Sequence, residues 1–237
     1  MYRRILIKLS GEALASNGES GIIDHEALLN VAKVIKNIHD EGTQISIVIG
    51  AGNVCRGALV EKVGIDRVTG DKMGMLGTII NSFAMMDALK RFGLNAVVLS
   101  AVEMERFTET FSPELADKYL NSNTVVVFGG GLGKPYFSTD TCATTRAIEI
   151  KADAILIAKN NVDGVFDDDP RFNKNATMFK RIKCSEIISR DLKVMDLTAI
   201  EMLKDKDIDV RVFNMKDPDN FTRVVRGEDI GTTIVKG

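Results

Sequence analysis

Short apolar runs alternate with amphipathic segments along the 237-residue chain. The first run, RRILIKLS at residues 3–10, indicates a strand because its apolar positions are nearly continuous. Later runs of the same kind are each separated from the next by a longer segment. We predict further strands at residues 44–50, 95–101, 124–130, 153–159, 208–214 and 231–236, with a less regular one at 176–182.

The segments between these runs have helical periodicity and helix-end signals. In residues 24–42 the apolar positions recur at helical spacing, Asp24 stands where an N-cap is expected, and Gly42 ends the pattern. Ser112 and Pro113 begin a short helix in the same way. Further helices are expected at 71–92, 139–152 and 195–207 and just after Pro218.

The helix expected at 71–92 differs from the others because it is apolar on most faces. Such a helix is typically buried, either in the core or against another subunit. Its methionines suit both environments, because their flexible side chains fill irregular gaps. This helix is therefore a plausible dimer surface.

The order of the elements predicts an α/β protein. Continuous apolar strands that alternate with helices are typical of a mainly parallel sheet covered on both faces. Antiparallel pieces are expected near residues 160–185 and at the C-terminus. The chain is 45% hydrophobic and has no internal repeat, low-complexity segment or linker, which favours one domain over residues 1–237.

The composition and the charge argue against several classes of protein. The formal net charge of −2 argues against a nucleic-acid surface, and no apolar run approaches the ~20 residues of a membrane span. The three cysteines are far apart and form no Cys-x-x-Cys pair, so neither a disulfide scaffold nor a zinc site is expected. The Asp167–Asp169 run lacks EF-hand spacing, and we interpret it as a solvated turn. We expect a cytoplasmic protein without a metal site built by its own side chains.

Glycine-rich turns follow several of the predicted strands. They occupy residues 8–11, 50–57 and 129–140, and a fourth, asparagine- and aspartate-rich turn occupies 159–170. In a parallel sheet these turns meet at one edge, where open α/β sheets bind ligands. Any single turn is more often plain turn chemistry, but the set favours a ligand that carries several phosphates.

None of these turns is a familiar nucleotide motif. The 129–140 segment resembles a P-loop, but Phe128 stands at the required first glycine and Pro135 at the required serine or threonine. The 50–57 turn fails the dinucleotide pattern because Cys55 stands at its last glycine.

Several charged residues are candidates for chemistry at this edge. Lys8 ends the first strand, where it either extends into solvent or meets an anion such as a transferring phosphoryl group. Arg56 either grips a phosphate or forms a surface salt bridge. Asp71 and Asp140 are helix N-caps by default, and Asp196 is either a cap or a carboxylate that orients a lysine.

Seven longer motifs lie along the chain: ILIKLSGEAL (5–14), VIGAGNVCRG (48–57), RVTGDKMGMLGT (67–78), PYFSTDTCATTRAIEI (135–150), VDGVFDDDP (162–170), LKVMDLTA (192–199) and IDVRVFNM (208–215). On these motifs, and over essentially its whole length, the chain resembles the bacterial uridylate kinases of the amino acid kinase superfamily. The resemblance implies a three-layer α/β/α sandwich and transfer of the γ-phosphate of ATP to UMP with Mg²⁺. It also implies a homohexamer built from dimers and inhibition by UTP.

The resemblance also implies roles for residues that match the family's motifs. Catalytic roles fall to Lys8, Arg56, Asp140 and Asp196. ATP binding falls to Lys8, Leu9, Ser10, Gly11, Gly52, Arg56, Asn160, Phe166 and Asp169. UMP binding falls to Ala51, Asp71, Leu132, Gly133, Lys134, Pro135, Tyr136, Phe137, Ser138 and Thr139.

The chain departs from the family pattern at a few of these positions. Ala51 replaces a usual glycine, Leu132 and Lys134 replace the threonine and asparagine of a Thr-Gly-Asn-Pro pattern, and Asn160-Asn161 replace Thr-Lys. We expect Lys134 to be dispensable for transfer and Lys8 to be essential. The 16–21 segment matches a region tied to GTP activation in some members, but its sequence differs, so no GTP regulation is inferred.

Two other functions remain open at this point. One is a superfamily kinase acting on glutamate, acetylglutamate or carbamate, which the Asp71 motif and the PYFSTD loop disfavour. The other is a nucleotide sensor without catalysis. Retention of Lys8, Arg56, Asp140 and Asp196 disfavours the sensor.

Overall fold

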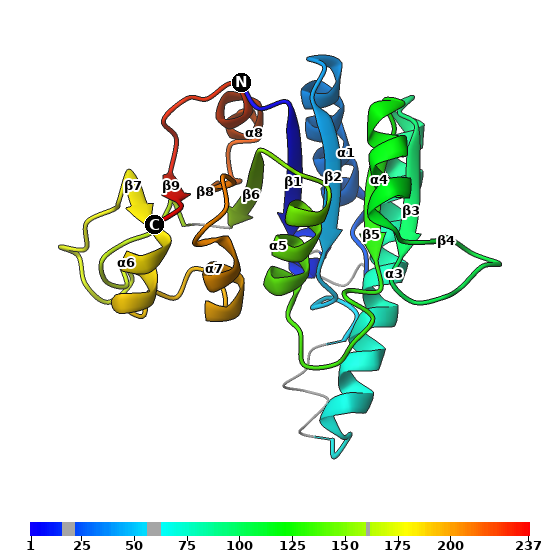
Figure 1. The fold of residues 1–237 in the computed structure, drawn as a ribbon, viewed down its shortest axis with the longest axis horizontal. Coiled ribbons are helices and arrows are strands. Elements are labelled where there is room, and N and C mark those ends of the chain that lie inside the picture. Colours follow the sequence, from blue (N-terminus) through cyan, green and yellow to red (C-terminus); the bar gives the residue numbers. More distant parts are fainter. Residues whose placement is uncertain (16–21, 56–62, 160–161) are drawn as a thin grey trace.

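The computed structural model describes residues 1–15, 22–55, 63–159 and 162–237, and in these residues nine strands form one sheet (Figure 1). The strand order is β4-β3-β5-β2-β1-β6-β8-β9-β7. The strands are β1 (Arg4–Leu9), β2 (Gln44–Ile49), β3 (Ala96–Ser100), β4 (Glu109–Thr110), β5 (Val125–Gly129), β6 (Ala154–Lys159), β7 (Arg181–Lys183), β8 (Asp209–Asn214) and β9 (Thr232–Val235).

Helices cover both faces of the sheet, so the predicted α/β/α sandwich is confirmed. Successive side chains of β1 alternate between two cores: Ile5 and Ile7 belong to one, and Leu6 to the other. The first core includes residues of α1 (His25–Asp40), α3 (Arg67–Arg91) and α8 (Asp219–Val225). The second includes residues of α4 (Pro113–Asn121), α5 (Thr139–Glu149), α6 (Cys184–Ser189) and α7 (Leu197–Leu203).

The sheet is mainly parallel, as predicted. β1 pairs in parallel with β2 and β6, and β5 pairs in parallel with β2 and β3. β9 runs antiparallel to β8, and β7 runs parallel to β9. Because β1, β2, β5 and β6 share a direction, the turns that follow them meet at one edge of the sheet.

The irregular C-terminal region differs most from the prediction. The strand expected at 176–182 is reduced to β7, and the antiparallel pairing expected near 160–185 is a single bridge between Phe166 and Met178. The helix expected at 195–207 ends at Leu203. β4 and α6 were not predicted, because elements of two and six residues are too short to show periodicity.

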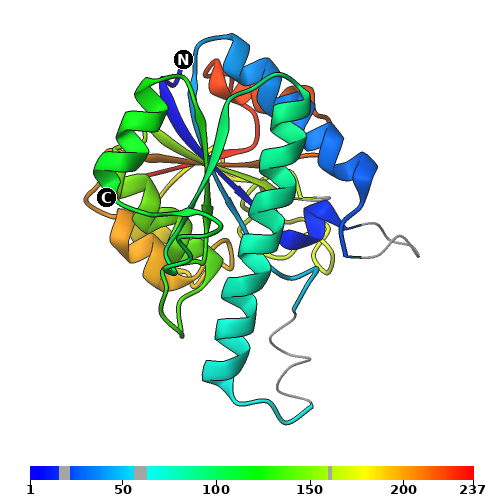
Figure 2. The same cartoon turned by 90° about the vertical axis from the view of Figure 1, so that its right-hand side faces the viewer.

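The long helix α3 begins earlier than predicted, and one part of it is exposed. Its N-cap is Asp66, which accepts hydrogen bonds from the amides of Val68 and Thr69, so the capping role considered for Asp71 is wrong. Its C-terminal part packs against β3 and β5 and buries Met85. Its N-terminal part extends past the strands (Figures 1 and 2).

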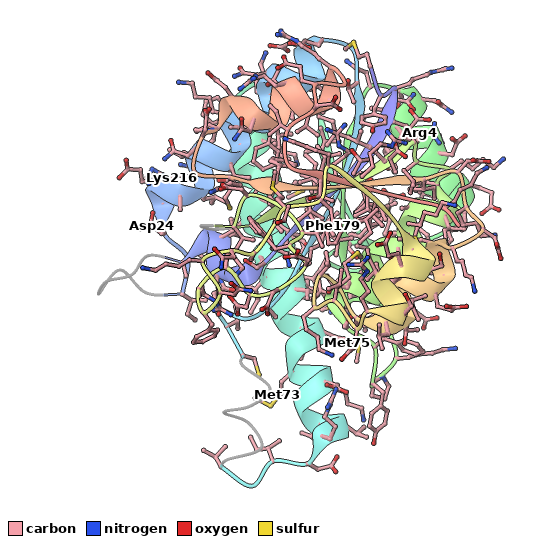
Figure 3. The ribbon with its side chains drawn as sticks, turned by 90° about the vertical axis from the view of Figure 1, so that its left-hand side faces the viewer. Arg4, Asp24, Met73, Met75, Phe179 and Lys216 are labelled. Atoms are coloured by element: carbon pink, nitrogen blue, oxygen red, sulfur yellow. The ribbon has the colours of Figure 1, made fainter. Side chains whose placement is uncertain are left out.

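Exposed apolar side chains lie along this protruding part of α3. Leu76 is 50% exposed, and Ile80, one turn further along α3 and level with the end of β5, is 49% exposed. Met73 is also exposed, and Figure 3 shows it with Met75 on the protruding turns. The prediction that the helix is buried in the chain's own core is therefore wrong for this part, which leaves the alternative of packing against another subunit. No helix of the described residues is long and apolar enough to cross a membrane.

Candidate active site

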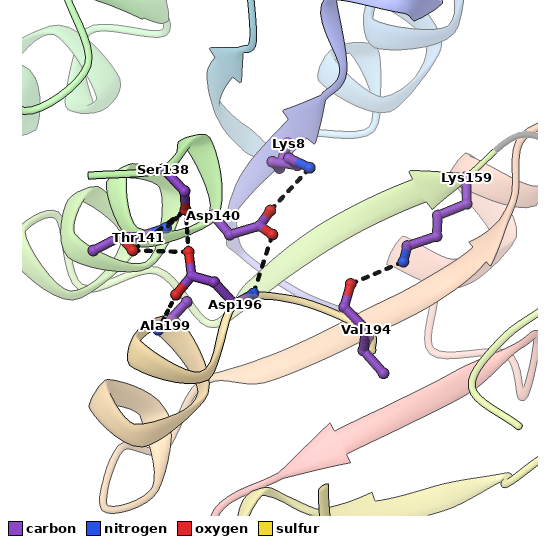
Figure 4. Close-up of polar contacts among 8 residues, drawn as sticks. All are labelled: Lys8, Ser138, Asp140, Thr141, Lys159, Val194, Asp196 and Ala199. Carbon is purple, nitrogen blue, oxygen red and sulfur yellow. Dashed lines mark hydrogen bonds and ion pairs between the residues drawn. The ribbon is translucent and has the colours of Figure 1, made fainter. Parts of the chain in front are cut away.

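The side chain of Lys8 pairs with a carboxylate near the end of β1 and does not extend into solvent. Its Nζ lies 2.9 Å from Oδ1 of Asp140, and both side chains are about four-fifths buried (Figure 4). Lys8 shares its face of β1 with Leu6, which directs it toward the layer that contains α5. The side chain of Lys8 is thereby held at the edge of the sheet where the glycine-rich turns meet.

Asp140 is not the N-cap of α5. Ser138 has that role, because its side chain accepts a hydrogen bond of 3.0 Å from the amide of Thr141. Asp140 stands in the first helical turn, where the partial positive charge of the helix N-terminus stabilises a carboxylate. The capping role considered for Asp140 is therefore wrong, and its carboxylate is directed to Lys8.

Asp196 is a cap, and it acts on Lys8 only through Asp140. Its Oδ1 accepts a hydrogen bond of 2.7 Å from the amide of Ala199, which caps α7. Its backbone amide donates to Oδ2 of Asp140 at 3.3 Å (Figure 4). The cap role considered for Asp196 is confirmed, whereas direct contact between its carboxylate and a lysine is absent from the described residues.

The carboxylate of Asp196 also joins α7 to α5. Its Oδ2 accepts hydrogen bonds from the hydroxyls of Ser138 and Thr141 (Figure 4). Burial acts to raise the pKa of the Asp196 carboxyl, but the hydrogen bonds from Ser138, the Ala199 amide and Thr141 outweigh it and hold that pKa below its ordinary value. Asp196 is therefore an anchored anion at the junction of the two helix N-termini.

The turns after β1 and β2 approach each other closely. A Cβ at Gly11 would lie 2.4 Å from Oδ1 of Asn53 and 2.6 Å from the carbonyl oxygen of Gly50, so only glycine fits there. Asn81 of α3 fixes the second turn: its side-chain amide donates to the Gly50 carbonyl and to Asn53, and Asn53 donates back to it. Backbone amides of both turns are thus brought to one place, as a phosphate-binding rim requires.

A pocket of about 340 Å³ lies between the turn after β2, α3 and the segment after β5. That size is in the range of small-molecule sites. Its lining includes six of the predicted UMP-binding residues: Ala51, Asp71, Lys134, Phe137, Ser138 and Thr139.

Asp71 joins two sides of this pocket. Its Oδ2 accepts a hydrogen bond of 2.7 Å from the backbone amide of Tyr136, and its Oδ1 pairs at 3.0 Å with Nε of Arg67, one helical turn earlier. The guanidinium of Arg67 also lies over the ring of Tyr136 at 5.6 Å. α3 and the 129–138 segment are therefore linked through charged and polar contacts at the pocket rim.

The 129–138 segment is a loop with left-handed backbone at several positions, and α5 begins only at Thr139, five residues after Lys134. Gly130 and Gly133 have φ of 76° and 71°, and Tyr136 has φ of 69°. Thr78 of α3 accepts from the amide of Gly130, and Arg146 of α5 donates to the carbonyl of Gly131. The loop is thus held from both helical layers of the sandwich.

Two residues that depart from the family pattern have clear positions. Leu132 packs against the second hydrophobic core and is absent from the pocket lining, so its side chain does not occupy the place of a ligand contact. The methyl group of Ala51 faces α3, because a Cβ at Gly77 would lie 2.9 Å from it. The extra methyl group is therefore directed toward a glycine that makes room for it.

The remaining ATP-side candidates are spread over several segments. Leu9 is fully buried, so only its backbone can reach a ligand, while Ser10 is exposed beside it. Phe166 and Asp169 lie in the segment after β6, where Asp169 pairs with Arg171 at 2.6 Å. Arg56 and Asn160 lie outside the described residues.

The sequence reasoning did not single out Arg67, Asn81 or Lys159. Arg67 precedes Asp71 by one helical turn, a spacing that favours an ion pair. Asn81 is a polar residue in an apolar stretch of helix, which is a signal of a buried hydrogen bond. Lys159 is the last residue of an apolar strand and Lys8 the last but one, so the pattern that indicates Lys8 also indicates Lys159.

A buried lysine–carboxylate pair beside glycine-rich turns, at the carboxyl edge of a parallel sheet, is an arrangement suited to binding and transferring phosphate. Residues 3–214 match the model of the amino acid kinase family, and the chain belongs to that family.

Solved structures with the same fold include two UMP kinases. The UMP kinase of Bacillus anthracis is 39% identical with a TM-score of 0.95, over 99% of this chain and 96% of that one. The UMP kinase of Ureaplasma parvum is 37% identical with a TM-score of 0.93, over 100% of both chains. The uridylate kinase of Archaeoglobus fulgidus is 26% identical with a TM-score of 0.75, over 98% of this chain and 99% of that one.

Proposed function

We propose that this protein is a UMP kinase, which transfers the γ-phosphate of ATP to UMP and releases UDP and ADP in pyrimidine nucleotide biosynthesis. The observation that carries the proposal is the Lys8–Asp140 ion pair at the strand edge where the turns of Gly11 and Gly52 approach each other, next in sequence to Ser138 and Thr139, which line a pocket large enough for an acceptor. The full-length likeness to two proteins named UMP kinases supports it.

The reaction requires two anions to approach in line, and the chain supplies the opposing charge. Lys8 faces the transferring phosphoryl group, the amides of Gly11 and Gly52 bind phosphate oxygens, and Arg56 bridges donor and acceptor. No covalent protein intermediate is needed, because phosphoryl transfer proceeds chiefly by positioning and charge neutralisation. Asp140 holds the ammonium of Lys8 in place, and Asp196 holds Asp140 through its backbone amide.

The acceptor lies in the pocket between α3 and the 129–138 loop. Asp71 and the segment from Leu132 to Thr139 hold UMP there. Of that segment, the pocket lining includes Lys134, Phe137, Ser138 and Thr139, and Ala51 borders the pocket from the turn after β2. The donor lies on the side of β6, where Asn160, Phe166 and Asp169 follow the strand. This division places the γ-phosphate between the two nucleotides, beside Lys8.

Mg²⁺ accompanies ATP in this proposal. The described residues contain no group of three or more His, Cys, Asp or Glu side chains that would form a metal cage. They fit an ion that is bound mainly by the phosphates of ATP and keeps several waters, as Mg²⁺ commonly does in kinases. The ion would supply further charge neutralisation on the phosphate oxygens.

The proposal extends to a cytoplasmic homohexamer that is inhibited by UTP. The exposed apolar side chains of α3, Met73, Leu76 and Ile80, support burial against a second copy. The whole chain of residues 1–237 acts as one kinase domain in each subunit. Neither a nucleic acid nor a membrane is among its partners.

One experiment separates this function from its alternatives. ADP release from MgATP is measured with UMP, CMP, glutamate, acetylglutamate and carbamate in turn. Turnover with UMP and with none of the acids supports the UMP kinase. Turnover with one of the acids instead would overturn it, and so would tight nucleotide binding with no turnover, the behaviour of a sensor.

A further inference from the structure

Lys159 is a second lysine at the same edge of the sheet as Lys8. β1 and β6 are neighbours, and Lys8 lies opposite Ile157 in their parallel register. Lys159 follows Ile157 by two positions, so its side chain lies on the same face of β6 as that of Ile157, which belongs to the second core. Lys159 therefore extends from the carboxyl end of β6, beside Lys8 and on the same face of the sheet.

The contacts of Lys159 leave its charge uncompensated. Its Nζ donates a hydrogen bond of 2.8 Å to the carbonyl oxygen of Val194, which is neutral (Figure 4). No carboxylate of the described residues forms an ion pair with it, whereas Lys8 has Asp140. Burial lowers the pKa of the Lys159 ammonium, the charge of Lys8 lowers it further, and Asp140 opposes this. Lys8 and Lys159 are thus two partly buried lysines at one edge of the sheet, and among the described residues only Lys8 pairs with a carboxylate.

We propose that Lys159 binds the phosphates of the donor nucleotide as a second cation beside Lys8. An ammonium has three N–H donors, and the Val194 carbonyl takes one, which leaves donors for phosphate oxygens. A polyphosphate would supply the anionic partner that Lys159 does not have among the described residues, and charge-assisted hydrogen bonds are the stronger kind. The inference deepens the proposed UMP kinase function and rests on it.

The sheet order assigns Lys159 to the donor rather than to the acceptor. The strands run β5-β2-β1-β6, and the acceptor pocket is built from the turns after β5 and β2 together with α3. Lys159 lies on the opposite side of β1 and is absent from the pocket lining. A ligand that reaches both Lys8 and Lys159 approaches from the β6 side.

The hydrogen bond from Lys159 to the Val194 carbonyl also has a structural effect. Val194 lies two residues before Asp196, whose amide contacts Asp140. Lys159 therefore also anchors the segment that carries Asp196, and a test must separate this anchoring from phosphate binding. Lys159→Gln keeps a hydrogen-bond donor without the charge, and Lys159→Arg keeps the charge.

The test compares binding of MgATP, ADP and adenosine by calorimetry, together with the KM values for ATP and UMP. We expect Lys159→Met and Lys159→Gln to weaken binding of ATP by about tenfold to a hundredfold, with adenosine bound as in the wild type. Lys159→Arg should retain most of the ATP affinity, and the KM for UMP should stay within about twofold in all three variants. The exposed Lys33 of α1 provides the control, Lys33→Met, which should bind ATP normally.

The inference is overturned if Lys159→Met binds ATP like the wild type. It is also overturned if ATP and adenosine lose affinity equally, or if Lys159→Gln behaves like the wild type, because these results describe anchoring alone. Circular dichroism of each variant verifies folding. Failure of the proposed function is distinguishable: wild-type protein that binds ATP but does not phosphorylate UMP refutes the kinase, while the titrations still decide the role of Lys159.

Discussion

At the scale of single residues, the site is a chain of contacts that ends on one ammonium group. Ser138 and Thr141 donate to Asp196, the Asp196 amide donates to Asp140, and Asp140 pairs with Lys8. Each link removes freedom from the next, so Lys8 is positioned before any ligand arrives. Preorganised charge of this kind is worth more in a partly buried site than in water.

Replacement of Lys8 tests the end of this chain. Lys8→Ala should lower kcat by about 10²–10³-fold, because the charge facing the transferring phosphoryl group is lost, while UMP still binds. Steady-state kinetics and a UMP titration measure the two effects. Lys134→Ala, which removes the lysine of the 129–138 loop, should keep kcat within about threefold of the wild type. Full turnover by Lys8→Ala would exclude a catalytic role for Lys8.

The lowered pKa of Asp196 makes the free energy of unfolding depend on pH. Its folded-state pKa lies below the ordinary value of 3.8, so its ionised form is the one that the fold stabilises. This contribution is fully present above pH ~4 and is lost as the pH falls through the lowered folded-state pKa. The difference in unfolding free energy between the wild type and Asp196→Asn should therefore be constant near neutrality and shrink below pH ~4. Urea unfolding at several pH values measures it, and a difference that grows on acidification contradicts the assignment.

At the scale of elements, the site depends on how closely two strand-end turns approach. The short 3-10 helix η1 (Gly11–Leu14) begins directly against the turn of residues 50–53. α3 holds that turn through Asn81, and it holds the 129–138 loop through Thr78 and Asp71. One helix therefore holds two loops that follow different strands, and η1 packs against one of them.

Gly11→Ala should destabilise the protein, because the new methyl group would meet the Gly50 carbonyl and the Gly52 amide nitrogen at 2.6 and 2.7 Å. The backbone must move, so both thermal stability and kcat should fall. Gly74→Ala is the matched change in α3, where nothing lies within 4 Å. It should stabilise the protein by about 0.5–1 kcal/mol through helix propensity. Differential scanning calorimetry compares the two, and a Gly11→Ala protein as stable as the wild type would refute the close approach.

At the scale of the whole molecule, the parallel sheet brings all the chemistry to one edge. The turns after β1, β2, β5 and β6 meet there, with the 340 Å³ pocket on one side of β1 and Lys159 on the other. The N-terminal part of α3 extends past the strands (Figure 2), and its side chains Met73 and Leu76 are exposed. Assembly of subunits through this part of α3 would also stabilise Asp71 and the pocket rim.

Substitution on this surface tests the proposed assembly. Leu76→Glu and Ile80→Glu should shift the protein from a hexamer to smaller species, because a charge would be buried between subunits. Light scattering coupled to size-exclusion chromatography gives the mass. Phe172→Glu, which changes an aromatic side chain that is 87% exposed after β6, should leave the mass unchanged. Hexamers of normal stability in both α3 variants would place the interface elsewhere.

Local patterns in the sequence determined the α/β class, the parallel sheet, most element positions and the caps Asp24 and Ser112, because periodicity and capping act between near neighbours. They also identified Lys8 as a residue at a strand end. The short elements β4 and α6 were missed, because they contain too few residues to show a period.

Only the tertiary structure decided which of the carboxylates meets Lys8. By sequence alone Asp71, Asp140 and Asp196 were all possible caps, yet Asp66 and Ser138 cap two of the helices and Asp196 caps the third. Asp140 is thereby left to pair with Lys8, and Lys159 is left with a neutral carbonyl. An ion pair depends on distance in space, and that distance is set by the order and direction of strands that lie far apart along the chain.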